Sequence, residues 1–357
     1  MERNCREDRW SSKSGTLLLF LTKGFVIPME PISRIDPSIN QLFFRGLNAT
    51  ELARTSDFES VLYLLVHGTL PNANQLEDLN KQMVELRGLF REDFHSLEIL
   101  VANLDAIKEK HGLNLYETLL TFVTLCPIVI ANQFVKTEGG QAESPNKDLG
   151  HAANFLWMVQ GKTPSRTDIT DFQTSLILPM DDPDNPSLTK LTQALEQDNI
   201  TEALLAALKE HVGLLHHGAG TQAMLMFEEI QTPEKTRECL TDRLNSGRKI
   251  FGLGHRIYTG VDPRAVVLRE TLERRTLETD DKWLLSVSDA VAEEGCSLLA
   301  EHKGIQTFPN IDLYNAAVNF TFGFPPELNT SLFAISRSAG WMAHILEQSN
   351  KKTFQKG

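Results

Sequence analysis

Apolar residues recur at helical spacing along almost the whole of this 357-residue chain, and no other feature constrains the fold as strongly. The segment Ser56-Asp57-Phe58-Glu59 has the form of a capping box, and an apolar face at Val61, Leu62, Leu64 and Leu65 follows it. Similar patterns predict further helices, over residues 75–89, 95–110, 115–134, 152–160, 191–214, 222–230, 232–245, 264–276, 283–302 and 331–347.

Strand candidates are few, and they lie near the start of the chain, at residues 26–35 and 41–44. Strands and helices do not alternate, and the sequence shows no internal repeat, which argues against a Rossmann fold or a barrel. We therefore predict the all-α class, with a small β element near the N-terminus.

Composition limits the partners that such a chain can have. Hydrophobic residues make up 41% and charged residues 23%, as in ordinary globular proteins, while the formal net charge of −12 argues against nucleic-acid binding. The four cysteines lie far apart in the sequence without metal-type spacing, so we expect reduced thiols in a cytoplasmic protein. The apolar run at residues 17–21 is too short to span a bilayer, and we predict residues 1–24 to be a poorly specified extension and no membrane association.

Three short blocks rich in glycine or proline each carry one side chain that can handle a proton. These are GLLHHGAG at 213–220 with His216, GLGHRIYTGVDPR at 252–264 with His255, and FPNID at 308–312 with Asp312. Glycine permits a close approach of backbone to ligand, and two imidazoles with a carboxylate can provide general acid–base catalysis. Arg256 and Arg264 in the second block suit recognition of a small anion.

Each of these residues also has a purely structural interpretation. His216 and His255 could be structural histidines, the latter at a helix C-terminus, and Asp312 could cap a helix or close an Asx turn. Arg337 lies in an apolar helical segment, where it needs an anionic partner if buried or forms a salt bridge at the rim if not. The spacing of histidines predicts no metal site, and no GxSxG elbow of a serine hydrolase is present.

Taken together, the blocks resemble those of the citrate synthase family. GLLHHGAGTQAMLMFEEI is similar to the family's GPLHGGAN block, GLGHRIYTGVDPRA to GxGHRVY…DPRA, and FPNIDLYNAAV to PNVDFY. RGLNATELA at 45–53 and the helical segment LFAISRSAGWMAHILEQ near the C-terminus extend the resemblance over residues 25–350. The resemblance implies a mostly helical dimer, with a large domain at 25–221 and 326–357 and a small mobile CoA-binding domain at 222–325.

Roles follow from the resemblance residue by residue. Asp312 matches the base that takes the methyl proton of acetyl-CoA, His216 the donor to the thioester oxygen, and His255 the residue that polarises the keto group of oxaloacetate. Arg264 and Arg337 match the arginines that hold the carboxylates of the oxo acid. The implied CoA-binding residues are Arg248, Lys249, Gly252, Leu253, Gly254 and Arg256. Acetyl-CoA or another acyl-CoA would be a co-substrate, and no metal or tightly bound cofactor is implied.

The chain departs from the family pattern around the oxo acid. The segment LILPMDDPDNPS places Asp182 where the family carries a histidine that contacts the oxo acid. Gln355 stands where the family has an arginine near the C-terminus. The resemblance implies citrate synthase activity, with a 2-methylcitrate synthase or a related synthase of altered specificity as one alternative. A protein that binds CoA or anions for regulation, without catalysis, is the other.

Overall fold

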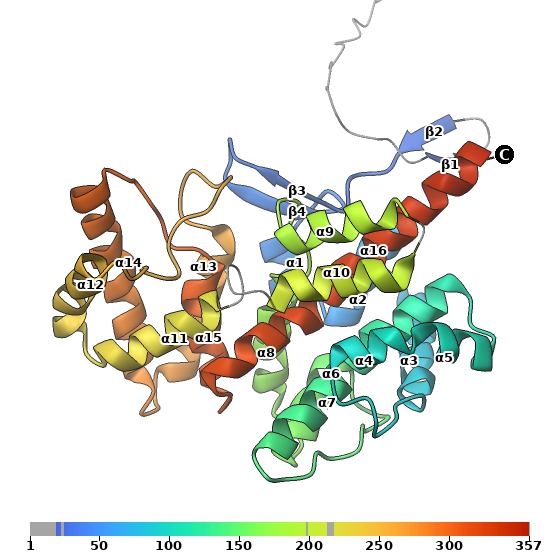
Figure 1. Ribbon diagram of the computed structural model, residues 1–357, viewed down its shortest axis with the longest axis horizontal. Helices are drawn as coiled ribbons and strands as arrows, with labels where there is room; N and C mark the ends of the chain where they lie inside the picture. Colours follow the sequence, from blue (N-terminus) through green and yellow to red (C-terminus); the bar gives the residue numbers. More distant parts are fainter. Residues whose placement is uncertain (1–18, 23–24, 198, 213–217, 357) are drawn as a thin grey trace, which may run out of the picture.

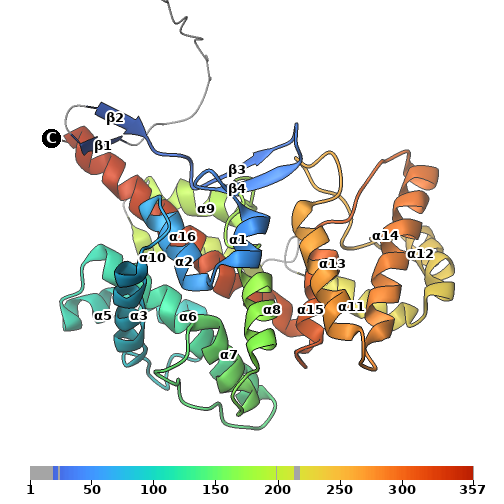
Figure 2. The same cartoon turned by 180° about the vertical axis from the view of Figure 1, so that it is seen from behind.

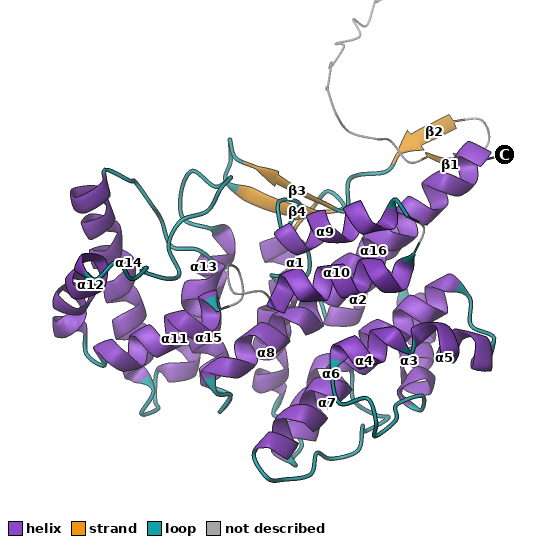
Figure 3. Cartoon of the chain, viewed as in Figure 1, coloured by secondary structure: helices purple, strands orange, loops and turns teal. Residues whose placement is uncertain are grey.

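The computed structural model describes residues 19–22, 25–197, 199–212 and 218–356, which are mostly helical (Figure 3), and the predicted all-α class is confirmed. The first ten helices are α1 Ala49–Thr55, α2 Phe58–His67, α3 Ala73–Arg87, α4 Leu97–Ala102, α5 Leu104–His111, α6 Leu115–Thr137, α7 His151–Gln160, α8 Arg166–Ile177, α9 Pro186–Leu195 and α10 Ile200–Val212. The others are α11 Ala219–Ile230, α12 Thr236–Asn245, α13 Pro263–Thr276, α14 Lys282–Lys303, α15 Ile311–Phe320 and α16 Asn329–Lys356, with short 3-10 helices at Pro233–Lys235 and Pro326–Leu328.

The β element near the N-terminus consists of two antiparallel sheets. Strand β1 (Leu19–Thr22) pairs with β2 (Phe25–Pro28), while β3 (Ser33–Asp36), β4 (Gln41–Phe44) and β5 (Leu47–Asn48) form the second sheet. The strand predicted at 41–44 is confirmed, but the one predicted at 26–35 is divided between β2 and β3. Pro28 ends β2 and Pro31 lies within the break, and proline has no N–H to donate to a ladder. The predicted extension over residues 1–24 includes β1, and its residues 1–18 and 23–24 lie outside the described part of the chain.

Three local expectations are corrected. The residue that caps α2 is Asp57, which accepts a bond from Ser60 N at 2.7 Å, so the capping box expected at Ser56 is wrong. Glu59 is buried and instead accepts a hydrogen bond from His151 N at the start of α7. The helix predicted at 191–214 is two helices, α9 and α10, and the one predicted at 95–110 is also two, α4 and α5, which meet at Asn103.

Helix α6 forms the centre of the core. Fourteen consecutive residues, Thr118 to Ala131, are buried, and α3, α7 and α16 pack around the helix. Among the described residues it is the only helix long and apolar enough to cross a membrane, and 78% of its apolar window is covered by protein. Burial on all sides explains an apolar helix of this length as part of a protein interior.

The helices gather in two groups, which Figures 1 and 2 show from opposite sides. Helices α11 to α15 lie together at one end of the molecule, and α1 to α10 lie at the other with most of α16, whose first turns reach toward α11. The predicted division into two domains, at 25–221 with 326–357 and at 222–325, remains a prediction. Movement of one helix group relative to the other would be needed to define the domains.

Candidate active site

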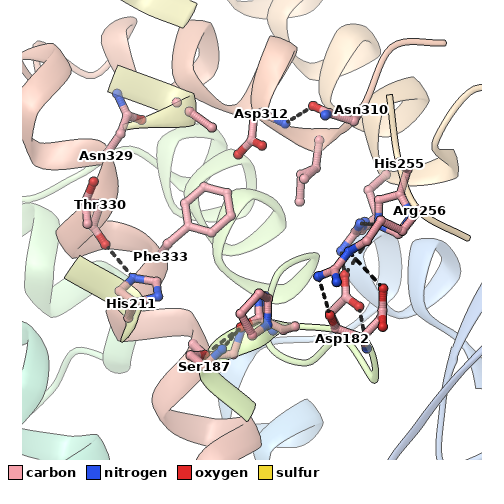
Figure 4. Close-up of a pocket in the computed structure, with 18 of the residues that line it drawn as sticks. Asp182, Ser187, His211, His255, Arg256, Asn310, Asp312, Asn329, Thr330 and Phe333 are labelled. Carbon is pink, nitrogen blue, oxygen red and sulfur yellow. Dashed lines mark hydrogen bonds and ion pairs between the residues drawn. The ribbon is translucent and has the colours of Figure 1, made fainter. Parts of the chain in front are cut away.

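A cavity of about 250 Å³ lies where the two helix groups meet. Its lining includes Asp182, His255, Arg264, Asp312 and Arg337, from segments that are as much as 155 residues apart in sequence. Figure 4 shows the labelled side chains around one open space, with Asp312 on one side and His255 and Asp182 on another. Five of the residues that the sequence singled out for chemistry or anion binding thus share a single site with Asp182: His255, Arg256, Arg264, Asp312 and Arg337.

The blocks that carry His255 and Asp312 are joined by their backbones. Gly254 N donates to Phe308 O at 2.8 Å and Asn310 N donates to Gly252 O at 2.9 Å, while the Asn310 side chain donates to Gly254 O at 2.8 Å. Gly252 has φ +82° and lies so close to Leu313 that a Cβ would be 2.8 Å from its Cα. The glycines of this block therefore allow the close backbone contact that brings the imidazole and the carboxylate into one cavity.

Asp312 occupies the first turn of α15. The cap of this helix is Asn310, whose Oδ1 accepts a hydrogen bond from Asp312 N at 3.0 Å, so the interpretation of Asp312 as the capping residue is wrong. Burial is the main influence on the Asp312 carboxyl and, with help from the charge of Asp262, raises its pKa to about 6. A carboxylate with a pKa near neutrality, facing a cavity, is suited to remove a proton as a general base.

His255 presents one nitrogen to the cavity in a defined state. Its Nδ1 accepts hydrogen bonds from Ile257 N at 3.2 Å and Tyr258 N at 3.4 Å, and a nitrogen that accepts carries no proton. With Nδ1 accepting, a neutral ring carries its proton on Nε2, which lies 3.7 Å from Asp182 Oδ2. Arg264 Nη2 lies 3.4 Å from the same nitrogen and, because a guanidinium only donates, it forms no hydrogen bond with Nε2 in this tautomer. His255 lies in a loop, so its placement at a helix C-terminus is wrong, and an Nε2–H could donate to an oxygen atom in the cavity.

Arg264 is held by two carboxylates. Its Nε and Nη2 donate to Asp262 at 3.0 and 2.9 Å, and its Nη1 donates to Asp182 at 3.2 Å. Asp262 is fully buried and also accepts from Arg264 N and Ile311 N, which connects the start of α13 to the start of α15. Burial alone would raise the pKa of Asp182, but the neighbouring His255 and the charges of Arg264 and Arg337 hold that pKa well below its ordinary value.

Arg337 differs from Arg264 in having unused donors. It belongs to α16 and is 3% exposed, and neither its Nε nor its Nη1 has a hydrogen-bond partner among the described residues. Burial lowers its pKa, against the opposing effect of the Asp182 and Asp181 charges. The expectation of a salt bridge at the rim is wrong, because the side chain is buried against the cavity with donors free to bind an anion.

The residues expected to bind CoA are spread along the cavity and its mouth. Gly254 and Arg256 line the cavity, and Arg256 is paired with the exposed Asp184. Lys249 lines a second, adjoining cavity of about 730 Å³, whereas Arg248 pairs with Glu229 on the surface. Gly252 and Leu253 face the 308–310 segment, where Leu253 forms a β-bridge with Pro309.

His211 is a titratable cavity residue that was missed from the sequence, and one predicted residue, His216, cannot be placed. His211 in α10 is 5% exposed, lines both cavities and donates from Nε2 to Thr330 O at 3.0 Å. Burial lowers its pKa to about 4, so the ring is neutral. Its position in an amphipathic helix gave no signal of a site. His216 lies outside the described residues, as does its neighbour His217.

Known proteins resemble this chain over most of its length. The family model described as citrate synthase, C-terminal domain, matches residues 22–356. The citrate synthase of Heyndrickxia coagulans is 29% identical over 354 residues, covering 93% of each chain, and the citrate/2-methylcitrate synthase of Bacillus subtilis is 28% identical with the same coverage. The crystal structure of citrate synthase from Pyrobaculum aerophilum superposes with a TM-score of 0.79 at 26% identity, covering 96% of this chain and 94% of that one.

Proposed function

The chain belongs to the citrate synthase family of acyl-transferring enzymes, and from this premise we propose that it condenses an acyl-CoA with a 2-oxo acid and then hydrolyses the thioester. One observation carries the proposal. A carboxylate with a pKa of about 6, an imidazole Nε2–H and a buried guanidinium with free donors surround one cavity.

These groups supply the parts that a Claisen condensation needs. Asp312 would take a proton from the carbon next to the thioester, and the resulting enol would attack the keto carbon of the oxo acid. His255 Nε2–H would donate to the keto oxygen as negative charge develops on it. Arg337 would hold a carboxylate of the oxo acid. We propose His216 as the donor to the thioester oxygen on the resemblance alone. Water would then cleave the thioester and release CoA.

The relative movement of the two helix groups would control the order of these steps. We propose that α11 to α15 close on the remaining helices once the oxo acid is bound. Closure would exclude water from the condensation and delay thioester hydrolysis until the new bond has formed. Arg248, Lys249, Gly252, Leu253, Gly254 and Arg256 are the residues that we propose to contact the CoA at the mouth of the cavity.

Acetyl-CoA with oxaloacetate is the first substrate pair to test, since several relatives are named citrate synthases. Propionyl-CoA is the second acyl donor, because the relative from Bacillus subtilis is named citrate/2-methylcitrate synthase. The competing proposal, a regulatory protein that only binds CoA, predicts thermal stabilisation by CoA and none by any 2-oxo acid. The resemblance also supports a location in the cytoplasm and a homodimer. Sedimentation of the purified chain would test the dimer.

The decisive assay follows free CoA thiol from acetyl-CoA or propionyl-CoA, with a panel of 2-oxo acids and without any. We expect release that depends on an oxo acid. Asp312→Asn should lower kcat by about 10²- to 10⁴-fold, because the base is lost, while CoA still raises the melting temperature. The matched control is Asp148→Asn, the same change at an exposed aspartate, which should keep full activity. An Asp312→Asn protein with the turnover of this control would remove Asp312 from the mechanism.

A further inference from the structure

The charges around the cavity do not suit an oxo acid with two carboxylates. Three guanidiniums, Arg256, Arg264 and Arg337, are matched by three carboxylates, Asp184, Asp262 and Asp182, so these six charges cancel before any substrate binds. Asp312 adds a further negative charge near pH 7, since its pKa is about 6. Among the residues that the structure describes, a dianion would therefore meet no excess of positive charge.

The two buried arginines also differ in the donors that they can offer. Three of the five N–H groups of Arg264 already point at Asp262 and Asp182, and the guanidinium is 2% exposed, so its orientation is fixed by those two partners. Arg337 is as deeply buried, yet its Nε and Nη1 have no partner among the described residues. A buried unpaired donor is costly unless a ligand completes it, so Arg337 is the receptor for one carboxylate.

Asp182 defines what the opposite end of the substrate must be. It is 7% exposed, lines the cavity, and lies 3.7 Å from the His255 nitrogen that would polarise the keto group. Its Oδ1 accepts from Asp184 N at 3.1 Å and its Oδ2 from Arg264, so each oxygen keeps capacity to accept one more hydrogen bond. At this position a second carboxylate of the substrate would be repelled, whereas a hydroxyl could donate.

We propose that the oxo acid of this enzyme carries a single carboxylate, which Arg337 binds, and directs a neutral hydrogen-bond donor such as a hydroxyl toward Asp182. This inference rests on the proposed condensation and specifies its acceptor substrate. Two like charges about 4 Å apart at an effective dielectric constant near 20 would by themselves discriminate against a dianion by roughly a thousand-fold. Because Arg264 pairs with Asp182 and offsets part of this repulsion, we expect a discrimination of roughly a hundred-fold.

A matched pair of substrates tests this with the unaltered enzyme. Oxaloacetate and 4-hydroxy-2-oxobutanoate have the same carbon skeleton and differ in carrying a carboxylate or a hydroxymethyl group at the far end. With acetyl-CoA, and again with propionyl-CoA, kcat/KM should be about a hundred-fold higher for the hydroxy compound. The same compound should also give the larger rise in melting temperature, which requires no turnover.

The variant Asp182→Asn removes the charge and keeps the shape of the side chain, so it should reduce the preference at least tenfold. Asp148→Asn, at an exposed aspartate that does not line the cavity, is the control and should leave the preference unchanged. A wild-type enzyme that prefers oxaloacetate in turnover and in thermal stabilisation would overturn the inference and leave the proposed condensation intact. No turnover and no stabilisation with any 2-oxo acid would overturn both.

Discussion

The fully buried Asp262 should contribute far more to stability than an exposed aspartate of the same site. Its carboxylate accepts four hydrogen bonds, three from Arg264 and one from Ile311 N, and it is 0% exposed. In Asp262→Asn the amide nitrogen would face a buried guanidinium, which retains only Asp182 as a partner. Leaving a buried charge short of its partner costs about 3–5 kcal/mol, and because Asp182 remains we expect about 3 kcal/mol.

The measurement is the apparent free energy of unfolding in guanidinium chloride at neutral pH, followed by circular dichroism. Asp184→Asn is the matched control, because Asp184 also pairs with an arginine at the cavity. The side chains of this pair are much more accessible, with 39% of Asp184 and 63% of Arg256 exposed. An exposed pair of this kind contributes at most about 1 kcal/mol. If Asp262→Asn lost no more than the Asp184→Asn control, the reasoning that this carboxylate holds α13 and α15 together would be refuted.

Two further predictions concern the base and its support. Asp312 must be ionised to accept a proton, and its pKa is about 6. We therefore expect kcat/KM to fall as the pH drops through about 6, with a slope that approaches tenfold per pH unit. A kcat/KM that stays constant from pH 7 to pH 5 would contradict the role of Asp312 as the base. A raised carboxyl pKa favours the protonated folded state, so this shift alone adds stability as pH falls from about 6 toward 4, and circular dichroism should show the fold intact at pH 5. Gly252→Ala should lower kcat at least tenfold, because a Cβ there collides with Leu313, the neighbour of Asp312. The control for backbone strain is Gly247→Ala, because Gly247 also has a positive φ but a Cβ there would have nothing within 4 Å. Equal losses of kcat in the two variants would exclude the collision as the cause.

The sequence predicted much of the local structure and of the site because the relevant signals are local. Helical periodicity and Gly or Pro punctuation act within a few residues, and they led to most helices and to the blocks around His255 and Asp312. Errors arose where nearby residues compete for one role, as when Asp57 caps α2 in place of Ser56. The interruption between α9 and α10, at Glu196 to Asn199, has no Gly or Pro to mark it, so the two helices read as one.

The pairing of charges was outside the reach of the sequence. Asp182 and Arg264 are 82 residues apart, and their contact depends on how the loop before α9 lies against the first turn of α13. The resemblance placed Asp182 beside the oxo acid. A carboxylate near an anionic substrate must be paired, be protonated or contact a different group of the substrate. The first of these holds, because Arg264 is its partner. His211 gave no signal at all, since a histidine within an amphipathic helix is not distinguishable from a structural one.

The two buried arginines of the cavity differ in their hydrogen-bond partners. This difference would allow one arginine to hold the site rigid while the other binds the substrate. Arg264 has its charge balanced by Asp262 and Asp182, so it acts as a fixed link between α13, α15 and the loop before α9. Arg337 is buried with its Nε and Nη1 unpaired among the described residues, which costs free energy unless a ligand binds them. A substrate carboxylate would remove that cost, so binding energy would come mainly from Arg337. Specificity would come from Asp182, because a group that repels the wrong substrate discriminates without strengthening the binding of the right one.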